Sequence, residues 1–238
     1  MDLSVIIPVF EESKKISGDI KAASKFLKTN LMSGEIIIVD DGSCDDTATV
    51  AKDIEIPPNI SLQVIRYPVH KGKGYAVRTG IKKSKGDIVL FIDSGLCVPY
   101  DNVLIGLQLL KDGECDIAHG SRFLPESRIL RPHTWSRRLS SVTFRKILFF
   151  ALNIPSEFTD TQCGLKMYRG DVARELYGQC MTDGFMFDIE IILRAVKQGY
   201  RIKEFPIEWT ADLDSRLSLM RVPWRVWSEW IRIKRALK

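Results

Sequence analysis

Long apolar runs, cysteine motifs and an export leader are absent from this sequence. No apolar run approaches the roughly 18 residues that a membrane-spanning helix needs. The five cysteines are odd in number and show no Cys-x-x-Cys spacing, which argues against a disulfide framework and a zinc site. The start, Met1-Asp2-Leu3, enters an apolar run with no basic segment before it. We therefore expect a reduced, cytosolic chain that neither spans a membrane nor is exported.

Charge of one sign is not in large excess either. The 35 Lys and Arg residues against 30 Asp and Glu residues leave a net charge of +5, which is too small to indicate a nucleic-acid partner. Hydrophobic residues make up 45% of the 238 residues and charged residues 27%, as in ordinary globular domains. No Pro-, Gly- or Ser-rich linker divides the chain, so one large domain with a terminal appendage is predicted.

The hydrophobic periodicity indicates an α/β fold. Apolar runs of strand length alternate with longer segments of helical period, as in a mostly parallel sheet with crossover helices on both faces. The predicted strands cover residues 3–10, 35–40, 61–67 and 87–92, and the predicted helices cover residues 13–32, 45–54 and 74–83. Beyond these the alternation weakens, and we predict a helix at 101–110 and a strand at 116–119.

Acidic residues follow three of the predicted strands. Glu11 follows the first strand, Asp40 and Asp41 end the second, and Asp93 follows the fourth. Each has a local explanation, because Asp favours turns and Ser43 is suited to cap the next helix. Ligands of open α/β sheets bind beyond the carboxyl ends of the strands, so their joint occurrence favours a ligand site.

A short segment of small and basic residues precedes the third predicted helix. Residues 70–74 read His-Lys-Gly-Lys-Gly. Backbone N–H groups at a helix start favour an anion, and a diphosphate suits this position. The segment has neither the Walker spacing nor the Gly-x-Gly-x-x-Gly fingerprint, so a solvated loop is the alternative.

These motifs resemble those of the inverting glycosyltransferases of family 2, which have the GT-A fold. The resemblance is found at residues 5–11, 39–43, 71–74 and 91–93. It continues at residues 120–123, 159–166, 185–190 and 204–207, which are similar to the dolichyl- or polyprenyl-phosphate sugar synthases. The Asp-Thr-Gln-Cys-Gly run at 160–164 resembles the glucosyl branch. The match covers about residues 3 to 220, nearly the whole chain.

The resemblance implies a single Rossmann-like GT-A domain with a donor site for a nucleoside-diphosphate sugar. UDP-glucose is the first expected donor and GDP-mannose the second. Asp40 is expected to hydrogen-bond the base, and Lys71 and Lys73 to lie near the base and the diphosphate. The full set of expected donor-binding residues is Pro8, Val9, Glu11, Asp40, Asp41, Gly42, Lys71, Lys73, Asp93, Ser94 and Arg216.

The resemblance also implies a divalent cation, Mg²⁺ or Mn²⁺, at Asp93. Here the sequence departs from the family, because the expected Asp-x-Asp reads Asp93-Ser94-Gly95 and the second carboxylate is missing. Two hypotheses remain open. A cation binds through Asp93, water and the diphosphate, or Arg216 supplies part of the positive charge.

The expected acceptor is a polyprenyl or dolichyl phosphate. Its oxygen is already ionised near neutral pH, so orientation matters more than a strong base. Arg122, with Arg137 or Arg138, is expected to bind this phosphate, although surface arginines are often only solvated. A hydroxyl acceptor would instead need a carboxylate base. The expected catalytic residues are Asp93, Arg122, Asp160 and Asp188, and the last two are the candidate bases.

Two segments indicate a membrane surface. Residues 221–238 place apolar residues at helical spacing among tryptophans and basic residues, as in an interfacial amphipathic helix. Residues 135–150 show a similar mixture. The alternative is that the tryptophans pack on the domain. We expect a GT-A domain at 1–220 and a basic tail at 221–238. The protein is expected to be peripheral on the cytoplasmic face of a membrane, or a membrane-protein partner supplies the membrane part.

Two other functions are compatible with an α/β sheet that has acidic strand ends. A nucleotidyltransferase would carry a glycine-rich phosphate loop after the first strand, which residues 8–12 lack. A non-catalytic nucleotide-sugar-binding module would explain Gly95 as the trace of a lost metal site. The acceptor-side residues Asp160 and Asp188 favour an enzyme over this module.

Overall fold

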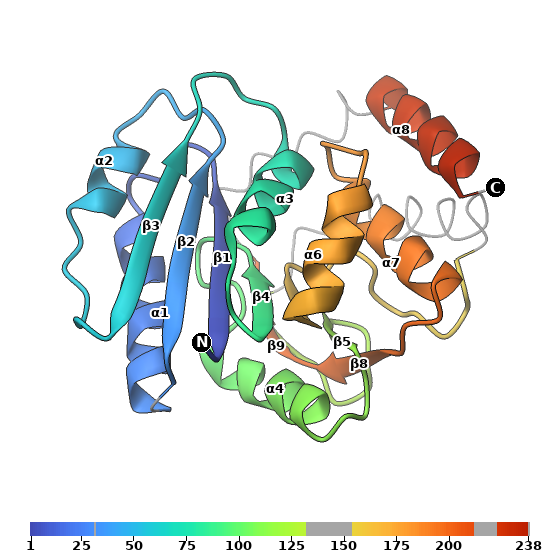
Figure 1. Ribbon diagram of the computed structural model, residues 1–238, viewed down its shortest axis with the longest axis horizontal. Helices are drawn as coiled ribbons and strands as arrows, with labels where there is room; N and C mark the ends of the chain where they lie inside the picture. Colours follow the sequence, from blue (N-terminus) through green and yellow to red (C-terminus); the bar gives the residue numbers. More distant parts are fainter. Residues whose placement is uncertain (31, 132–153, 212–222, 238) are drawn as a thin grey trace.

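A seven-stranded sheet forms the centre of the computed structural model, which describes residues 1–30, 32–131, 154–211 and 223–237 (Figure 1). Its strands run in the order β3-β2-β1-β4-β7-β5-β8. They are β1 (Leu3–Val9), β2 (Gly34–Asp40), β3 (Ile60–Arg66), β4 (Ile88–Ile92), β5 (Ile117–Ser121), β7 (Leu165–Arg169) and β8 (Ile202–Pro206). Only β7 runs antiparallel to its neighbours in this sheet, so the sheet is mostly parallel, as predicted.

Helices cover both faces of the sheet, which explains why β1 and β2 are buried along their whole length. One face packs against α1 (Ile16–Thr29), α2 (Thr47–Lys52) and α4 (Val103–Lys111). The other packs against α3 (Lys73–Lys83), α6 (Gly170–Gln179) and α7 (Phe187–Lys197). This three-layer arrangement confirms the predicted fold class (Figure 1).

Some elements differ from the prediction. The first helix is three residues shorter at each end than the predicted 13–32, and the second is Thr47–Lys52 rather than 45–54. A one-turn helix η1 (Tyr100–Asn102) leads into α4. The short strands β6 (Arg128–Arg131) and β9 (Glu208–Thr210) form a second, two-stranded sheet that periodicity cannot predict in so few residues. The basic segment at 135–150 lies outside the described residues.

The C-terminal helix α8 (Pro223–Ala236) packs on the domain. Its Ile233 is fully buried against residues at and near α7, namely Met186, Ile189 and Ile192. Trp230 packs against the same cluster, as in the alternative considered for the tail. The side chains of Trp224 and Trp227 lie outside the described residues. No helix of the described chain combines the length and apolar character that crossing a membrane requires.

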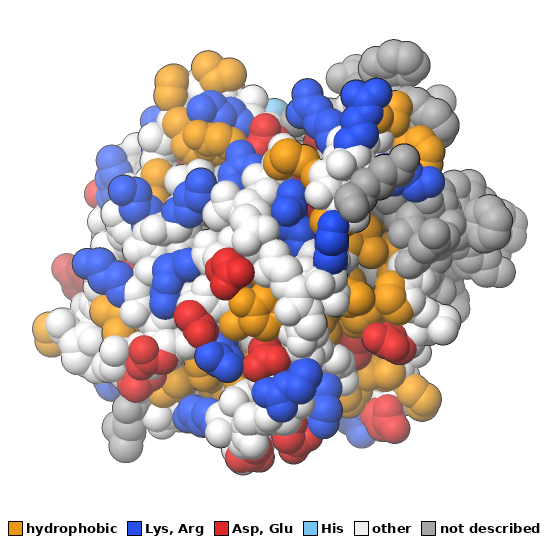
Figure 2. All heavy atoms as spheres, turned by 45° about the vertical axis from the view of Figure 1, so that its right-hand side comes forward, with side chains coloured by type: hydrophobic (Ala, Val, Ile, Leu, Met, Phe, Trp, Pro, Cys, Tyr) orange, Lys and Arg blue, Asp and Glu red, His pale blue; other side chains and the backbone are white. Residues whose placement is uncertain are grey.

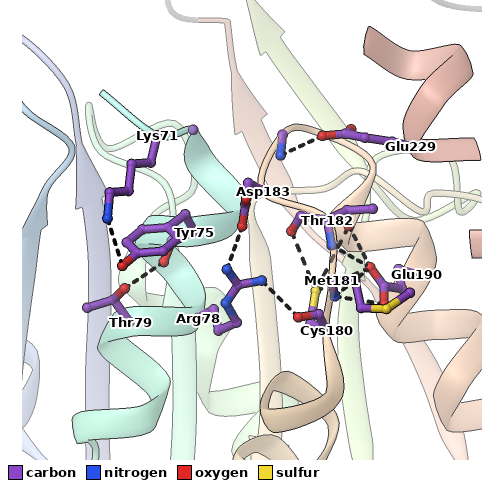
Figure 3. A network of polar contacts seen from close by, with 12 residues as sticks. Lys71, Tyr75, Arg78, Thr79, Cys180, Met181, Thr182, Asp183, Glu190 and Glu229 are labelled. Carbon is purple, nitrogen blue, oxygen red and sulfur yellow. Dashed lines mark hydrogen bonds and ion pairs between the residues drawn. The ribbon is translucent and has the colours of Figure 1, made fainter. Parts of the chain in front are cut away.

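A buried carboxylate fixes α8 to the loop between α6 and α7. Glu229 is 5% exposed and accepts a hydrogen bond of 2.9 Å from the N–H of Gly184 (Figure 3). A Cβ atom at Gly184 would come within 2.6 Å of Glu229 Oε1, so glycine is needed for this close approach. The tail is therefore joined to the same loop that leads into α7.

Candidate functional site

Backbone and side-chain hydrogen bonds bring the ends of β1 and β2 together. The N–H of Asp41 donates to Val9 O at 2.9 Å, and the N–H of Glu11 donates to Ser43 Oγ at 2.7 Å. Glu11 has a φ of +54°, so the chain turns sharply as it leaves β1. The acidic residues after the two strands thus share one edge of the sheet, as the sequence predicted.

Asp40 is a fully buried carboxylate at this edge. Its Oδ1 accepts the N–H of Ser43 at 2.9 Å. Its Oδ2 has no hydrogen-bond donor among the described residues, and Arg66 Nε lies 3.5 Å away. A buried carboxylate oxygen without a donor is costly, so this atom is ready to accept a hydrogen bond from a ligand.

Asp41 holds the loop before α3. Its carboxylate accepts the N–H groups of Lys71 at 2.8 Å and Gly72 at 2.9 Å, and His70 Nδ1 lies 2.8 Å from it. Gly42 has a φ of +75°, and a Cβ there would lie 2.6 Å from the backbone nitrogen of His70. Asp41 and Gly42 therefore act by fixing the loop, because the Asp41 carboxylate is occupied by it.

Lys73, the first residue of α3, pairs with Asp93 at the end of β4. Its Nζ lies 2.7 Å from Oδ1 and 2.9 Å from Oδ2. Burial opposes the charge of Lys73, but the carboxylates of Asp93 and Asp188 outweigh it and raise its pKa. A methyl group at Gly164 would overlap the Asp93 carboxylate, and the Asp93 N–H donates to Gly164 O at 2.8 Å. The site thus keeps a charged lysine and a carboxylate side by side.

Arg122, just after β5, forms a two-pronged ion pair with Asp160. Nε lies 2.6 Å from Oδ2 and Nη2 lies 2.8 Å from Oδ1. Burial alone would raise the pKa of Asp160, but the guanidinium lowers it. Glu204 on β8 supports this pair by accepting the N–H groups of Thr159 and Asp160, each at 2.9 Å. Among the described residues, no hydrogen bond is made by Arg122 Nη1, which is therefore the nitrogen proposed for a ligand.

Asp188, in the first turn of α7, pairs with Lys166 of β7 inside the protein. The two side chains are almost fully buried, and Lys166 Nζ also donates to Cys163 O at 2.8 Å. Burial raises the pKa of Asp188, and the positive charge of Lys166 opposes this shift. Asp188 therefore already forms an ion pair with a buried lysine.

The loop from Cys180 to Met186 sets the start of α7 beside the start of α3. Glu190 is buried and accepts the N–H and hydroxyl of Thr182 at 2.8 and 2.7 Å. Asp183 O accepts the N–H of Tyr75 at 3.2 Å, and Asp183 Oδ1 accepts from Arg78 at 2.5 Å. Figure 3 shows the contacts of Arg78 in α3 with Asp183 and Cys180 of the loop. This network explains how Asp188 comes close enough to influence Lys73.

The described residues do not form a metal site by themselves. They contain no group of three or more His, Cys, Asp or Glu side chains suited to hold an ion. Both oxygens of Asp93 contact Lys73, and Gly95, with a φ of +87°, stands where a second carboxylate was expected. One carboxylate suits a cation that arrives on a ligand's phosphates, but not one held by the protein alone.

The remaining predicted site residues fall into two groups. Pro8 and Val9 are buried in β1, whereas Ser94 is half-buried in the turn after β4. Arg137, Arg138 and Arg216 lie outside the described residues.

Two positioning side chains were missed by sequence reasoning, Lys166 and Glu204. The signal for Lys166 was a charged residue between Leu165 and Met167, whereas Glu204 follows a second charged residue, Lys203, and gave no such signal.

Comparison with known proteins gives one family and several relatives. The family model described as Glycosyl transferase family 2 matches residues 4–176. A dolichyl-phosphate beta-glucosyltransferase of Dictyostelium discoideum is 30% identical over 225 residues, which are 90% of this chain and 68% of the relative. Glycosyltransferase AglD of Haloferax volcanii is 24% identical over 93% of this chain, and the match covers 35% of AglD. The chain thus spans about a third of that relative.

A solved structure shares the fold. Glucosyl-3-phosphoglycerate synthase from Mycobacterium tuberculosis, in complex with Mn²⁺ and UDP-glucose, superposes with a TM-score of 0.69 at 18% identity. The match covers 99% of this chain and 77% of the other. At this identity the likeness concerns the fold.

Proposed function

Because the chain belongs to glycosyl transferase family 2, we propose that it moves glucose, with inversion at the anomeric carbon, from UDP-glucose to a polyprenyl or dolichyl phosphate. The observation that supports this most is the group of three ion pairs at the carboxyl edge of the sheet. They are Lys73–Asp93, Arg122–Asp160 and Lys166–Asp188. Lys73 and Arg122 are the two cations of this group whose side chains are partly exposed and can contact a phosphate.

The donor nucleoside is proposed to lie over the ends of β1 and β2. A uracil ring presents an N–H group, and Asp40 Oδ2 is a buried acceptor without a donor among the described residues. A guanine edge also presents N–H groups, so GDP-mannose remains the second donor. The relative from Dictyostelium discoideum is named a glucosyltransferase, which favours glucose as the transferred sugar.

The diphosphate is proposed to lie against the start of α3. Backbone N–H groups and the helix dipole favour an anion there, and Lys73 adds a full positive charge. As the nucleoside diphosphate leaves, its negative charge grows and the sugar carbon becomes oxocarbenium-like. A fixed cation at this place stabilises the transition state more than the ground state.

A divalent cation, Mg²⁺ or Mn²⁺, is proposed to enter with the donor. The similar synthase was solved with Mn²⁺ and UDP-glucose. In this chain Asp93 is the one carboxylate placed to contact such an ion, whose remaining ligands would be diphosphate oxygens and water. The cation would supply further positive charge to the leaving group.

The acceptor is proposed to be a phosphate rather than a hydroxyl. An ionised phosphate oxygen needs no base, and Arg122 Nη1 can orient it, with Arg137 or Arg138 as further candidates. Asp188 is paired with Lys166 and Asp160 with Arg122, so neither candidate base is free to take a proton. A hydroxyl acceptor, with Asp188 as its base, would require the Lys166 pair to open.

The membrane surface is proposed to meet the outward face of α8, on the cytoplasmic side, with or without a membrane-protein partner. Arg232, Lys234 and Arg235 are exposed there, and a shallow hollow is lined by Met181, Arg232 and Arg235. Figure 2 shows Lys and Arg side chains gathered at the upper right of this face, beside hydrophobic ones. Basic residues next to exposed apolar ones suit anionic lipid headgroups.

Replacing Arg232 and Arg235 together by Gln is expected to weaken binding to vesicles that contain phosphatidylserine. Each basic residue near such a surface contributes about 1 kcal/mol, so the loss is roughly 30-fold at low salt. Sedimentation with vesicles measures it, and the exposed pair Lys25 and Lys28 of α1, replaced in the same way, is the control. Equal binding by all three proteins would exclude this face of α8 as the contact.

Transfer of radiolabelled sugar into a lipid extract tests the donor. Purified protein is given UDP-glucose or GDP-mannose with polyprenyl phosphate in detergent, and Mg²⁺, Mn²⁺ or EDTA. We expect product from UDP-glucose, and less product with EDTA. Product from GDP-mannose alone would overturn the donor assignment. Full activity in EDTA would overturn the proposal that a divalent cation takes part.

A further inference from the structure

The turn that follows β4 has an unusual backbone. Two consecutive residues, Gly95 and Leu96, have φ values of +87° and +52°. Glycine adopts such values freely, but a leucine does so rarely and at a cost. This turn begins at Asp93, the residue that contacts Lys73, so something must hold it in this shape.

Asp19 of α1 supplies that support. Its carboxylate is 2% exposed and accepts the N–H of Gly95 at 2.9 Å and 3.1 Å, one distance to each oxygen. It also accepts the N–H of Leu96 at 3.2 Å. Both left-handed residues therefore direct their N–H groups at one buried carboxylate, which lies 76 residues earlier in the chain than Gly95.

The hydrogen bonds from Gly95 and Leu96 are the main interactions that stabilise the charged form of Asp19. Burial raises the pKa of Asp19 to about 6, because the N–H bonds from Gly95 and Leu96 only partly offset the loss of water. Glu12 nearby raises the pKa of Asp19 further and Lys15 lowers it. Burial, and after it the charge of Asp19, raises the pKa of Tyr100 in η1. A carboxylate kept buried at this cost suggests a role beyond helix capping.

We propose that Asp19 is a positioning residue that holds the turn after β4 in the shape in which Asp93 faces the donor diphosphate. Asp93 is fixed from one side by its N–H bond to Gly164 O, and the residues after it are fixed by Asp19. Asp19 itself touches neither donor nor acceptor in this assignment. The inference rests on the proposed donor site and adds a residue of α1 to it.

Two variants and a control test this role. In Asp19→Ala both N–H groups lose their acceptor, so the turn loosens and we expect the Kd for UDP and the KM for UDP-glucose to rise about tenfold or more. Asp19→Asn keeps one carbonyl oxygen and is expected to lose less. Ser24→Ala, another buried polar residue of α1, is the matched control and should bind UDP as the unmodified protein does.

The pH profile gives a readout that a general loss of stability would not produce. Below about pH 6 Asp19 takes up a proton and one of its oxygens stops accepting, so UDP affinity of the unmodified protein should fall as the pH drops through that value. The Asp19→Asn protein has no such proton to gain, so its UDP affinity should not show this fall as the pH drops. Hydrogen exchange at the Gly95 and Leu96 amides should be faster in Asp19→Ala.

Unchanged amide exchange and unchanged UDP affinity in a folded Asp19→Ala protein would overturn the inference. If Asp19→Ala fails to fold, the Asp19→Asn protein provides the test. The inference would then be overturned if its UDP affinity had the same pH profile as that of the unmodified protein. Absence of UDP binding by the unmodified protein would instead overturn the proposed donor site, while amide exchange would still test the support of the turn.

Discussion

Asp93→Asn is expected to lower the rate of sugar transfer about 10³-fold, as the loss of a principal electrostatic group at a reacting centre does. The amide keeps the size of the side chain but removes the charge that both oxygens present to Lys73 at 2.7 and 2.9 Å. It also removes the one described carboxylate that could contact a cation on the diphosphate. The kcat for transfer from UDP-glucose measures this effect.

The control for Asp93 is Asp87→Asn just before β4, an exposed carboxylate outside the site, which should retain most activity. Thermal unfolding of both variants shows whether the fold is kept. An Asp93→Asn protein that is folded and within about tenfold of the unmodified rate would contradict the role assigned to Asp93, because one lost charge contact of this kind costs more.

Arg122→Ala is expected to be the most damaging of the substitutions to stability, and also to abolish transfer. It leaves the carboxylate of Asp160 buried without its cation, which costs about 3–5 kcal/mol in comparable buried pairs. Arg122→Lys keeps the charge but cannot reproduce the two parallel bonds of 2.6 and 2.8 Å, so it should fold and still transfer poorly. Urea unfolding and kcat separate the two effects.

The Arg122 pair also predicts a pH dependence. The folded protein lowers the pKa of Asp160 below its ordinary value of 3.8, so the pair contributes stability above that value. That contribution is lost as the pH falls below 3.8 and through the lowered pKa. The exposed pair of Arg128 with Glu208 is the control, since Arg128→Ala should cost less than about 1 kcal/mol. Equal destabilisation by Arg122→Ala and Arg128→Ala would contradict the account.

The sheet, and the edge of the sheet where the acidic strand ends lie, could be predicted because they depend on local signals. Parallel strands buried on both faces are continuous apolar runs, as in Leu3–Val9 and Gly34–Asp40. The residues that follow such strands share one edge, so the sequence alone predicts Asp40 and Asp93 at that edge. Asp41 was predicted as a donor-binding residue, and only the structure shows that its carboxylate holds the N–H groups of Lys71 and Gly72.

Other roles depend on contacts between distant residues. Nothing near Asp19 in the sequence indicates that it bonds to Gly95, and Glu204 supports Thr159 from 45 residues away. The sequence pattern of the tail also does not decide what its apolar stripe contacts. An apolar stripe on a helix fits a lipid surface as well as a neighbouring helix, and the burial of Ile233 against Met186 shows that α8 uses it for packing.

The most direct test of the account compares two acceptors that differ only in the phosphate. The protein is given radiolabelled UDP-glucose with polyprenyl phosphate or with the corresponding polyprenol, and the lipid extract is analysed for labelled product and its anomeric configuration. The account predicts a β-glucosyl phosphate from the first acceptor and none from the second. Label on the alcohol, lost in Asp188→Asn, would contradict it and identify a hydroxyl acceptor with Asp188 as the base.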